Sequence, residues 1–195
     1  MDAKEILCQA GRIMSSKRLT DMAGGNISLR VADIVYMSPR FAGQAYKWNL
    51  SPDLIVSGRW ADDEITKNPA FSREGWSHLE LYRAFPLVTA VVHAHAFHIM
   101  PFTAFQKNIE PVLEATNKFG VVEFCKPAPA HTRELAGYVV EAMHGKETMM
   151  KTQAAAVMIP FHGIILCGEN FDKTLDALER IDVNAYCLLS RKALE

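Results

Sequence analysis

The chain has 195 residues, of which 49% are hydrophobic and 22% charged, a composition that excludes disordered, collagen-like and coiled-coil proteins. Lysine and arginine number 21 and aspartate and glutamate 22, so the formal net charge is −1. Because the chain has neither a basic run nor an uninterrupted apolar stretch of about 18 residues, we expect a cytoplasmic protein that binds neither nucleic acid nor membrane. No repeat or linker divides the sequence, which predicts a single domain over residues 1–195.

The first half of the chain predicts a helix, a hairpin and a second helix. Apolar residues at helical spacing near the amino terminus predict an amphipathic helix that ends near Arg18. Short β-branched runs predict strands over residues 27–31, 34–37 and 54–57, with a tight turn at Ala32 and Asp33 between the first two. The second helix is expected to take Ser72 as its N-cap and to end before Pro86.

The second half of the chain predicts alternating strands and helices. We expect strands over residues 90–95, 121–124, 154–159 and 163–167, and helices over about 132–143 and 172–191. Several links between strands are short, whereas parallel strands need long crossover connections. The fold class we predict is therefore α/β, with a mixed and mostly antiparallel sheet covered by helices.

The four cysteines lie far apart in the sequence, and none belongs to a CxxC pair. This spacing fits neither a disulfide framework nor a thiolate zinc site. We therefore expect reduced and mostly buried thiols at Cys8, Cys125, Cys167 and Cys187.

Two histidines at alternate positions of a predicted strand are the first candidates for chemistry. The rings of His93 and His95 would project from one face of that strand and could chelate one ion. His162 stands at a turn between two apolar runs, and Glu74 stands in the first turn of a predicted helix, where the helix dipole favours a carboxylate. Three imidazoles and a carboxylate suit Zn²⁺. The alternative interpretation is a histidine pair in the core and an ordinary capping glutamate.

A glycine pair leads directly into the first predicted strand. Gly24 and Gly25 would let backbone amides approach a ligand, and Asn26 offers a side-chain amide to an anion or a hydroxyl. The alternative interpretation is a plain turn before a strand.

Two further histidines lie near these motifs. We interpret His98, just beyond the paired histidines, as a structural residue or a support for the metal ligands. His78 follows Glu74 by four positions, so it would either orient that carboxylate or cap a neighbour.

Taken in order, these motifs resemble the class II aldolase/adducin family over roughly residues 5–190. The matching segments are GGNIS at 24–28, SP at 38–39, LSPD at 50–53, VVHAHAFH at 91–98, TREL at 132–135 and HG at 162–163. The resemblance implies a three-layer α/β/α sandwich and a homotetramer with active sites at subunit interfaces. It also implies a lyase of carbohydrate metabolism. Such an aldolase cleaves or forms a carbon–carbon bond in a small hydroxylated, anionic substrate, through a metal-stabilised enediolate.

The resemblance further implies the roles of the metal-site residues. His93, His95 and His162 would hold one Zn²⁺ per chain, or another divalent ion such as Mn²⁺ or Co²⁺. Glu74 would be a movable metal ligand that, once displaced by substrate, acts as the general acid and base. Dehydratases, epimerases and decarboxylases share this scaffold, and so do adducin-like assembly domains that bind no metal, so these remain alternatives.

The substrate anion is expected to bind beside the metal. The predicted site consists of Gly25, Asn26, Ser28, Arg40, Gly43, Ser72 and Arg73. Arg40 and Arg73 stand where phosphate-binding aldolases of the family have small residues, and a planar guanidinium would suit a carboxylate. We expect only one of these two arginines to point into the site.

Overall fold

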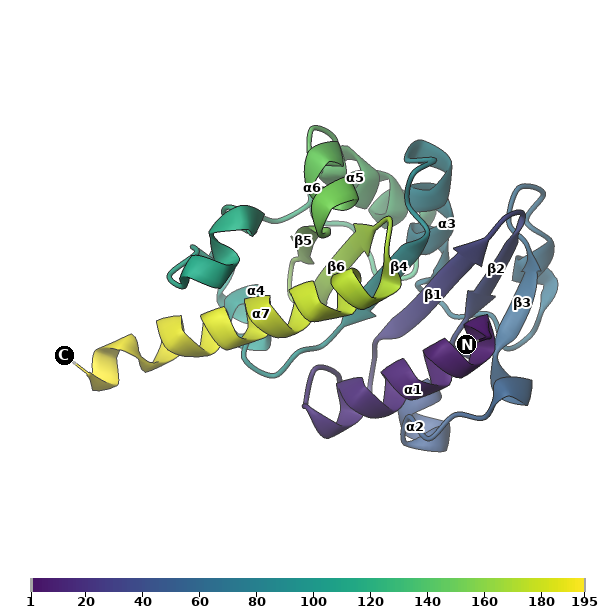
Figure 1. The fold of residues 1–195 in the computed structure, drawn as a ribbon, viewed down its shortest axis with the longest axis horizontal. Helices are drawn as coiled ribbons and strands as arrows, with labels where there is room; N and C mark the ends of the chain where they lie inside the picture. The colour runs from purple at the N-terminus through teal and green to yellow at the C-terminus, as the bar shows by residue number, and fades with distance from the viewer. Residues whose placement is uncertain (1, 195) are drawn as a thin grey trace.

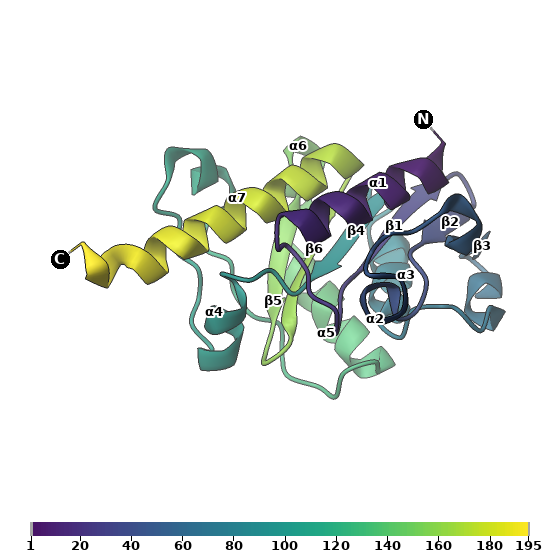
Figure 2. The same ribbon diagram turned by 90° about the horizontal axis from the view of Figure 1, so that it is seen from below.

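The computed structural model describes residues 2–194 and contains one six-stranded sheet between two layers of helices (Figures 1 and 2). The strand order is β3-β2-β1-β4-β6-β5, and every neighbouring pair is antiparallel. The strands are β1 (Asn26–Val31), β2 (Ile34–Met37), β3 (Val56–Arg59), β4 (Ala90–Ala94), β5 (Ala155–Ile159) and β6 (Gly163–Gly168). The predicted α/β sandwich with a mostly antiparallel sheet is thereby confirmed.

Helices cover both faces of the sheet, as Figure 2 shows for α1 and α7 on one side and α3 and α5 on the other. The first face carries α1 (Ala3–Ser16), α4 (Met100–Phe105) and α7 (Phe171–Ser190), and the second carries α3 (Gly75–Ala84), α5 (Arg133–Met143) and α6 (Glu147–Thr152). A separate apolar cluster fills each interface, with Leu7 and Leu178 in one and Leu79 and Leu135 in the other. Burial of these side chains against the sheet is the main stabilising contribution.

Several predicted element ends are displaced in the structure. The helix expected to begin at Ser72 begins at Gly75, because the Ser72 hydroxyl accepts a hydrogen bond from Asn26 Nδ2 instead of capping a helix. The strand expected over residues 54–57 begins at Val56, since a 3₁₀ turn occupies Pro52–Leu54. By contrast, the helix expected over about 132–143 is α5, and the side chain of its N-cap, Thr132, accepts a hydrogen bond from the Leu135 N–H.

Residues 121–124 do not form the predicted strand. Val122 makes an isolated antiparallel bridge with Ile109, and Phe124 makes a parallel bridge with Met158. A single bridge pairs a few backbone groups without forming a β-ladder. An apolar run in the sequence looks the same in both cases, so it predicted a strand here. The short helices α2 (Ala42–Tyr46), α4 and α6 were not predicted, because none is long enough to show a helical period.

The four cysteines are free, and Cys8, Cys125 and Cys167 are buried. Burial raises the pKa of the Cys125 thiol to about 11 and that of Cys167 to about 12. Within residues 2–194 no helix is long and apolar enough to cross a membrane.

The sheet order determines where polar residues meet. Strand β4 lies between β1 and β6, with Asn26 opposite His93 on one side and Ala94 opposite Ile164 on the other. The first residue of β1, the end of β4 and the turn before β6 therefore lie together at one edge of the sheet.

Candidate metal centre

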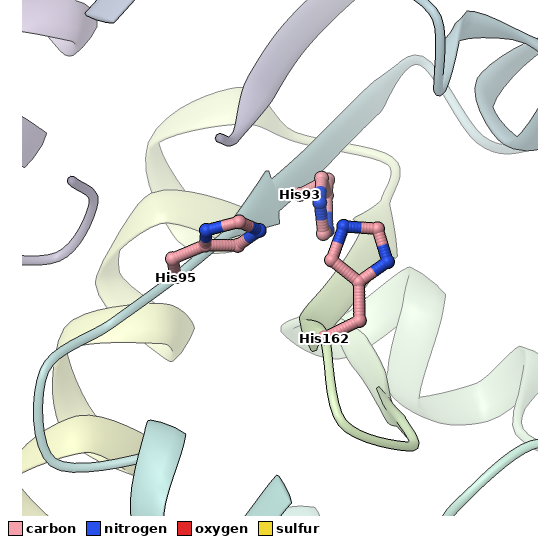
Figure 3. Close-up of side chains that lie close together, drawn as sticks. All are labelled: His93, His95 and His162. Carbon is pink, nitrogen blue, oxygen red and sulfur yellow. The ribbon is translucent and has the colours of Figure 1, made fainter. Parts of the chain in front are cut away.

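Three histidines converge where β4 ends and where β5 turns into β6 (Figure 3). The ring centroids of His93, His95 and His162 lie 4.9 to 5.3 Å apart. One ligand nitrogen from each ring lies within 4.8 Å of the others. This three-histidine cluster has the compactness that a single metal ion requires.

Hydrogen bonds at Nδ1 leave Nε2 of His93 and Nε2 of His95 available for a metal. Nδ1 of His93 lies 3.0 Å from the carbonyl oxygen of Ile164, and Nδ1 of His95 lies 3.2 Å from a carboxylate oxygen of Asp21. Both partners only accept, so each Nδ1 carries the hydrogen and each Nε2 keeps its lone pair.

Buried nitrogens without a partner indicate that the cluster fits a metal ion. Among the described residues, Nε2 of His93 and Nε2 of His95 are buried and have no hydrogen-bond partner. Nδ1 of His162 is also buried and unpartnered, but it points away from the other two rings, and Nε2 of that ring faces them (Figure 3). Unsatisfied buried polar atoms are costly, and native structures contain few of them. A borderline-soft divalent ion would satisfy such a set of imidazoles.

Burial keeps the imidazoles of His93 and His162 neutral. Burial, and then the charges of His162 and His95, holds the pKa of His93 well below its usual value of 6.5. Burial is also the largest cause that lowers the pKa of His162 to about 4, followed by the charge of His95. At neutral pH both rings are therefore in the unprotonated state that metal binding requires.

Asp21 connects the glycine loop with the cluster. Its Oδ1 atom accepts hydrogen bonds from the N–H groups of Ala23 and Gly24, at 2.9 and 2.8 Å, and from His95. Burial of Asp21 opposes its ionisation, but the hydrogen bond and charge of His95 and the two backbone bonds outweigh burial and lower its pKa below 3.8. The carboxylate therefore stays charged and fixes the orientation of the His95 ring.

Two glycines provide the space that the rings occupy. A Cβ atom on Gly24 would lie 2.0 Å from Cε1 of His95, which is far inside van der Waals contact. A Cβ atom on Gly163 would lie 2.5 Å from the carbonyl oxygen of Ala94 and 2.9 Å from Cδ2 of His95. The glycine loop is therefore required sterically for the cluster.

Glu74 lies beside the cluster, with its side chain only 7% exposed. Its Oε1 atom is 3.9 Å from Nδ1 of His162 and 2.8 Å from Nδ1 of His131, and it also accepts the N–H of His131 at 2.9 Å. Glu74 is not part of the set whose ligand atoms lie within 4.8 Å. The structure thus brings this sequence-predicted residue to the histidines, with its carboxylate held by His131.

A pocket of about 140 Å³ opens next to the cluster. The predicted anion-site residues that line it are Gly25, Asn26, Arg40, Gly43, Ser72 and Arg73. Ser28 was also predicted, but its hydroxyl is buried and lies 2.7 Å from both His78 Nδ1 and Tyr82 Oη. Helix α3 covers this part of β1, so Ser28 cannot reach a ligand in the pocket.

Both arginines line the pocket, whereas only one of them was expected to point into it. The guanidinium carbons of Arg40 and Arg73 lie 4.7 and 5.3 Å from the centroid of the Phe41 ring. The ring of Phe41, a residue with a φ of +63°, supports both cations by cation–π contact. The pocket therefore combines two positive charges with the amide of Asn26.

His78 and His98, the two further histidines considered from the sequence, lie outside the pocket. His98 binds Asp182 through its backbone N–H at 2.9 Å and its Nδ1 at 2.7 Å, which attaches the segment after β4 to α7. His98 is therefore structural, one of the two roles expected for it. His78 bonds with Ser28 and does not orient Glu74, and burial lowers its pKa to about 3.

Three residues of the site, Asp21, Phe41 and His131, were not predicted from the sequence. Asp21 precedes the glycine pair closely, and its position in the loop is the one signal that could have identified it. His131 is 57 positions away from Glu74 and directly precedes the cap of α5, and no local pattern indicates its contact.

Comparisons with known proteins show which family the chain is similar to. The sequence profile of the class II aldolase and adducin N-terminal domain matches residues 5–189. An L-fuculose phosphate aldolase of Haemophilus influenzae is 28% identical over 186 residues, which cover 93% of this chain and 81% of the relative. The corresponding aldolase of Methanococcus vannielii is 29% identical over 189 residues, or 93% of each chain. The crystal structure of L-fuculose-1-phosphate aldolase from Thermus thermophilus has the same fold, with a TM-score of 0.81, 19% identity and coverage of 98% and 95%.

Proposed function

The chain belongs to the class II aldolase and adducin family, and on that premise we propose that it is a metal-dependent aldolase. Its substrate would be a small hydroxylated, anionic compound in which a carbon–carbon bond is cleaved or formed. The observation that carries this proposal is the three-histidine cluster with its unpartnered nitrogens, next to a nearly buried carboxylate. Two relatives that are 28% and 29% identical are named L-fuculose phosphate aldolases, which supports a sugar phosphate as the substrate.

Zn²⁺ is the ion we propose, one per chain, with Mn²⁺ or Co²⁺ as alternatives. Neutral imidazoles favour Zn²⁺, and the acceptors on Nδ1 of His93 and His95 fix the tautomer that leaves Nε2 free. When bound, the ion would supply Lewis-acid polarisation of a substrate carbonyl. His93, His95 and His162 are 1%, 10% and 18% exposed, so the site is shielded from bulk water.

Glu74 is the residue we assign to proton transfer. Its carboxylate faces the pocket and lies next to the cluster, so a substrate held there would be within its reach. Because the Glu74 carboxylate is nearly buried and already oriented, it loses little conformational freedom when it transfers a proton. This favours general acid and base catalysis.

Arg40 and Arg73 would bind the anionic group of the substrate, together with Asn26 and Ser72. Charge-assisted bonds from guanidinium groups are stronger than those from neutral donors and match both phosphate and carboxylate. This pair also supports a second candidate reaction, decarboxylation, because a carboxylate substrate would find two cationic partners in the pocket. Dehydration and epimerisation would use the same site. An adducin-like assembly role is less favoured, since it gives no reason for the unpartnered nitrogens.

We also propose a cytoplasmic homotetramer with active sites at subunit interfaces. The free and mostly buried cysteines suit a reducing compartment. On α7, Val183, Tyr186 and Leu189 are 46%, 53% and 46% exposed, and such an apolar row suits contact with another subunit. Light scattering of the purified protein measures the number of subunits directly.

An assay with L-fuculose 1-phosphate and a panel of small phosphorylated and carboxylated hydroxyketones tests the proposed reaction. Aldehyde release should be detected with at least one compound, should stop after chelation and should return with Zn²⁺. A fully metal-loaded protein that releases aldehyde from none of them would contradict the aldolase proposal, and carbon dioxide release would favour the decarboxylase.

A further inference from the structure

His131 approaches Glu74 with two groups at once. Its backbone N–H donates to Oε1 of Glu74 at 2.9 Å, and its ring Nδ1 lies 2.8 Å from the same oxygen. A nitrogen this close to a carboxylate oxygen requires a hydrogen on Nδ1. One residue therefore binds the carboxylate through both its main chain and its side chain.

The backbone of His131 is strained in a way that accompanies this contact. Its φ is +68°, in the left-handed region where residues other than glycine are uncommon. Such conformations persist where the surroundings hold them, and they occur often at functional sites. Glycine would adopt the same φ without strain, but it would lack the ring that contacts Glu74.

Neighbouring contacts anchor His131 to a regular element. The next residue, Thr132, caps α5 through the Leu135 N–H and donates its hydroxyl to the carbonyl of Pro129 at 2.7 Å. The ring of His131 lines the pocket, and its centroid is 6.3 Å from that of His162. His131 thus holds Glu74 from a segment that is attached to the start of α5.

We propose that His131 is a positioning residue that keeps the Glu74 carboxylate apart from the three-histidine cluster. Oε1 of Glu74 is 3.9 Å from Nδ1 of His162, and Glu74 lines the same pocket as the three rings, so a carboxylate released by His131 can turn through the pocket toward an ion held by the cluster. Held by His131, the same carboxylate stays directed at the pocket. The inference rests on the proposed function only in taking the cluster to be a metal site.

Two variants of His131 separate the ring from the backbone. His131→Gly keeps the N–H, removes the ring and relieves the strained φ, so it does not threaten folding. His131→Asn returns a side-chain N–H donor in a residue that tolerates the left-handed region. Gln106→Gly is the matched control, because Gln106 has a φ of +51° and does not line the pocket.

The experiment measures Zn²⁺ affinity by competition with a chromophoric chelator and determines crystal structures with and without Zn²⁺. His131→Gly should bind Zn²⁺ about two- to tenfold more tightly than the parent, because Glu74 is no longer retained by the ring contact. His131→Asn and Gln106→Gly should stay within about twofold of the parent. Adding Glu74→Gln to His131→Gly should abolish the gain. In the crystals of His131→Gly, the carboxylate should have left its parental position.

If the parent protein binds Zn²⁺, the proposal requires both the tighter Zn²⁺ binding and the displaced Glu74 carboxylate in His131→Gly. An unchanged affinity, or a Glu74 carboxylate that stays at its parental position in His131→Gly, overturns the proposal. A parent that binds no Zn²⁺ contradicts the proposed function instead. In that case the metal-free crystal structures alone decide whether His131 positions Glu74.

Discussion

Asn26 and His93 are register partners on the antiparallel strands β1 and β4. Directly opposite residues project from the same face of a sheet, so the side chain of Asn26 lies beside an imidazole of the three-histidine cluster. Backbone pairing in the centre of the sheet therefore sets the spacing between the proposed anion site and the proposed metal site. Loops contribute Asp21, Arg40 and His162 around this fixed pair.

Replacing Glu74 with glutamine should separate catalysis from metal binding. Glu74→Gln keeps the size of the side chain but removes the group that carries the proton. We expect kcat on the identified substrate to fall about 10²- to 10⁴-fold, with the Zn²⁺ content unchanged, because the imidazole nitrogens remain in place. Steady-state kinetics and elemental analysis of the same preparation check this. Full activity in Glu74→Gln would show that another group transfers the proton.

Replacing the two arginines should weaken substrate binding. Because both arginines line the pocket, Arg40→Ala and Arg73→Ala should each raise KM, by roughly 10- to 150-fold for a lost charge-assisted bond. Lysine at either position should restore binding of a phosphate better than that of a carboxylate, since an ammonium lacks the planar fork.

The outcome for the arginines is decided by kinetics on matched phosphate and carboxylate compounds. Arg180→Ala is the control, because Arg180 pairs with Asp176 on α7 and does not line the pocket. Parental KM values in both Arg40→Ala and Arg73→Ala would leave Asn26 and Ser72 as the anion site.

A methyl group at Gly24 should displace His95. The Cβ atom of Gly24→Ala would lie 2.0 Å from Cε1 of the ring, so the imidazole or the loop must move. We expect Zn²⁺ affinity to fall at least tenfold, as when the orientation of a metal ligand is lost. Gly137→Ala is the control, because a Cβ atom there meets nothing within 4 Å. Equal Zn²⁺ affinity in parent and Gly24→Ala would show that His95 is not a ligand.

His78 should make the metal-free protein less stable in acid. Burial lowers its pKa to about 3, below the value of 6.5 for the unfolded chain, so the unfolded chain binds more protons between these two pH values. Stability therefore falls as the pH drops through this window, by about 2 kcal/mol from His78 between pH 7 and pH 5.

Urea denaturation at these two pH values measures the effect. The loss of unfolding free energy between pH 7 and pH 5 should be smaller in His78→Asn by about 2 kcal/mol. His144→Asn is the control, because the side chain of His144 is 62% exposed. The same pH dependence in parent and His78→Asn would mean that His78 is not held neutral by the fold.

Local sequence patterns predicted the features that short segments form on their own, such as a hairpin, a helix and two histidines on one face of a strand. The β-branched runs over residues 27–31 and 34–37 and the tight turn at Ala32 and Asp33 predicted the hairpin of β1 and β2, and the helix predicted from about Thr132 is α5. The spacing of His93 and His95 predicted two rings on one face, which the structure places 5.3 Å apart.

Contacts between segments that are distant in the sequence could not be predicted from local sequence patterns. Asn26 and Ser28 project from the same face of β1, but only the packing of α3 decides that Ser28 is covered by the helix whereas Asn26 lines the pocket. The hold of His131 on Glu74 depends on a left-handed residue and on a segment 57 positions away. Neither feature has a periodicity or a motif that local propensity could detect.

The metal content of the purified protein tests the proposed metal centre most directly. Elemental analysis measures it in the parent and in His93→Ala. The parent should contain or take up about one Zn²⁺ per chain, with metal–nitrogen distances of about 2.0 to 2.1 Å, and His93→Ala should bind much less. Less than about a tenth of an equivalent after incubation with Zn²⁺, in parent and His93→Ala alike, would contradict a metal centre at the three histidines.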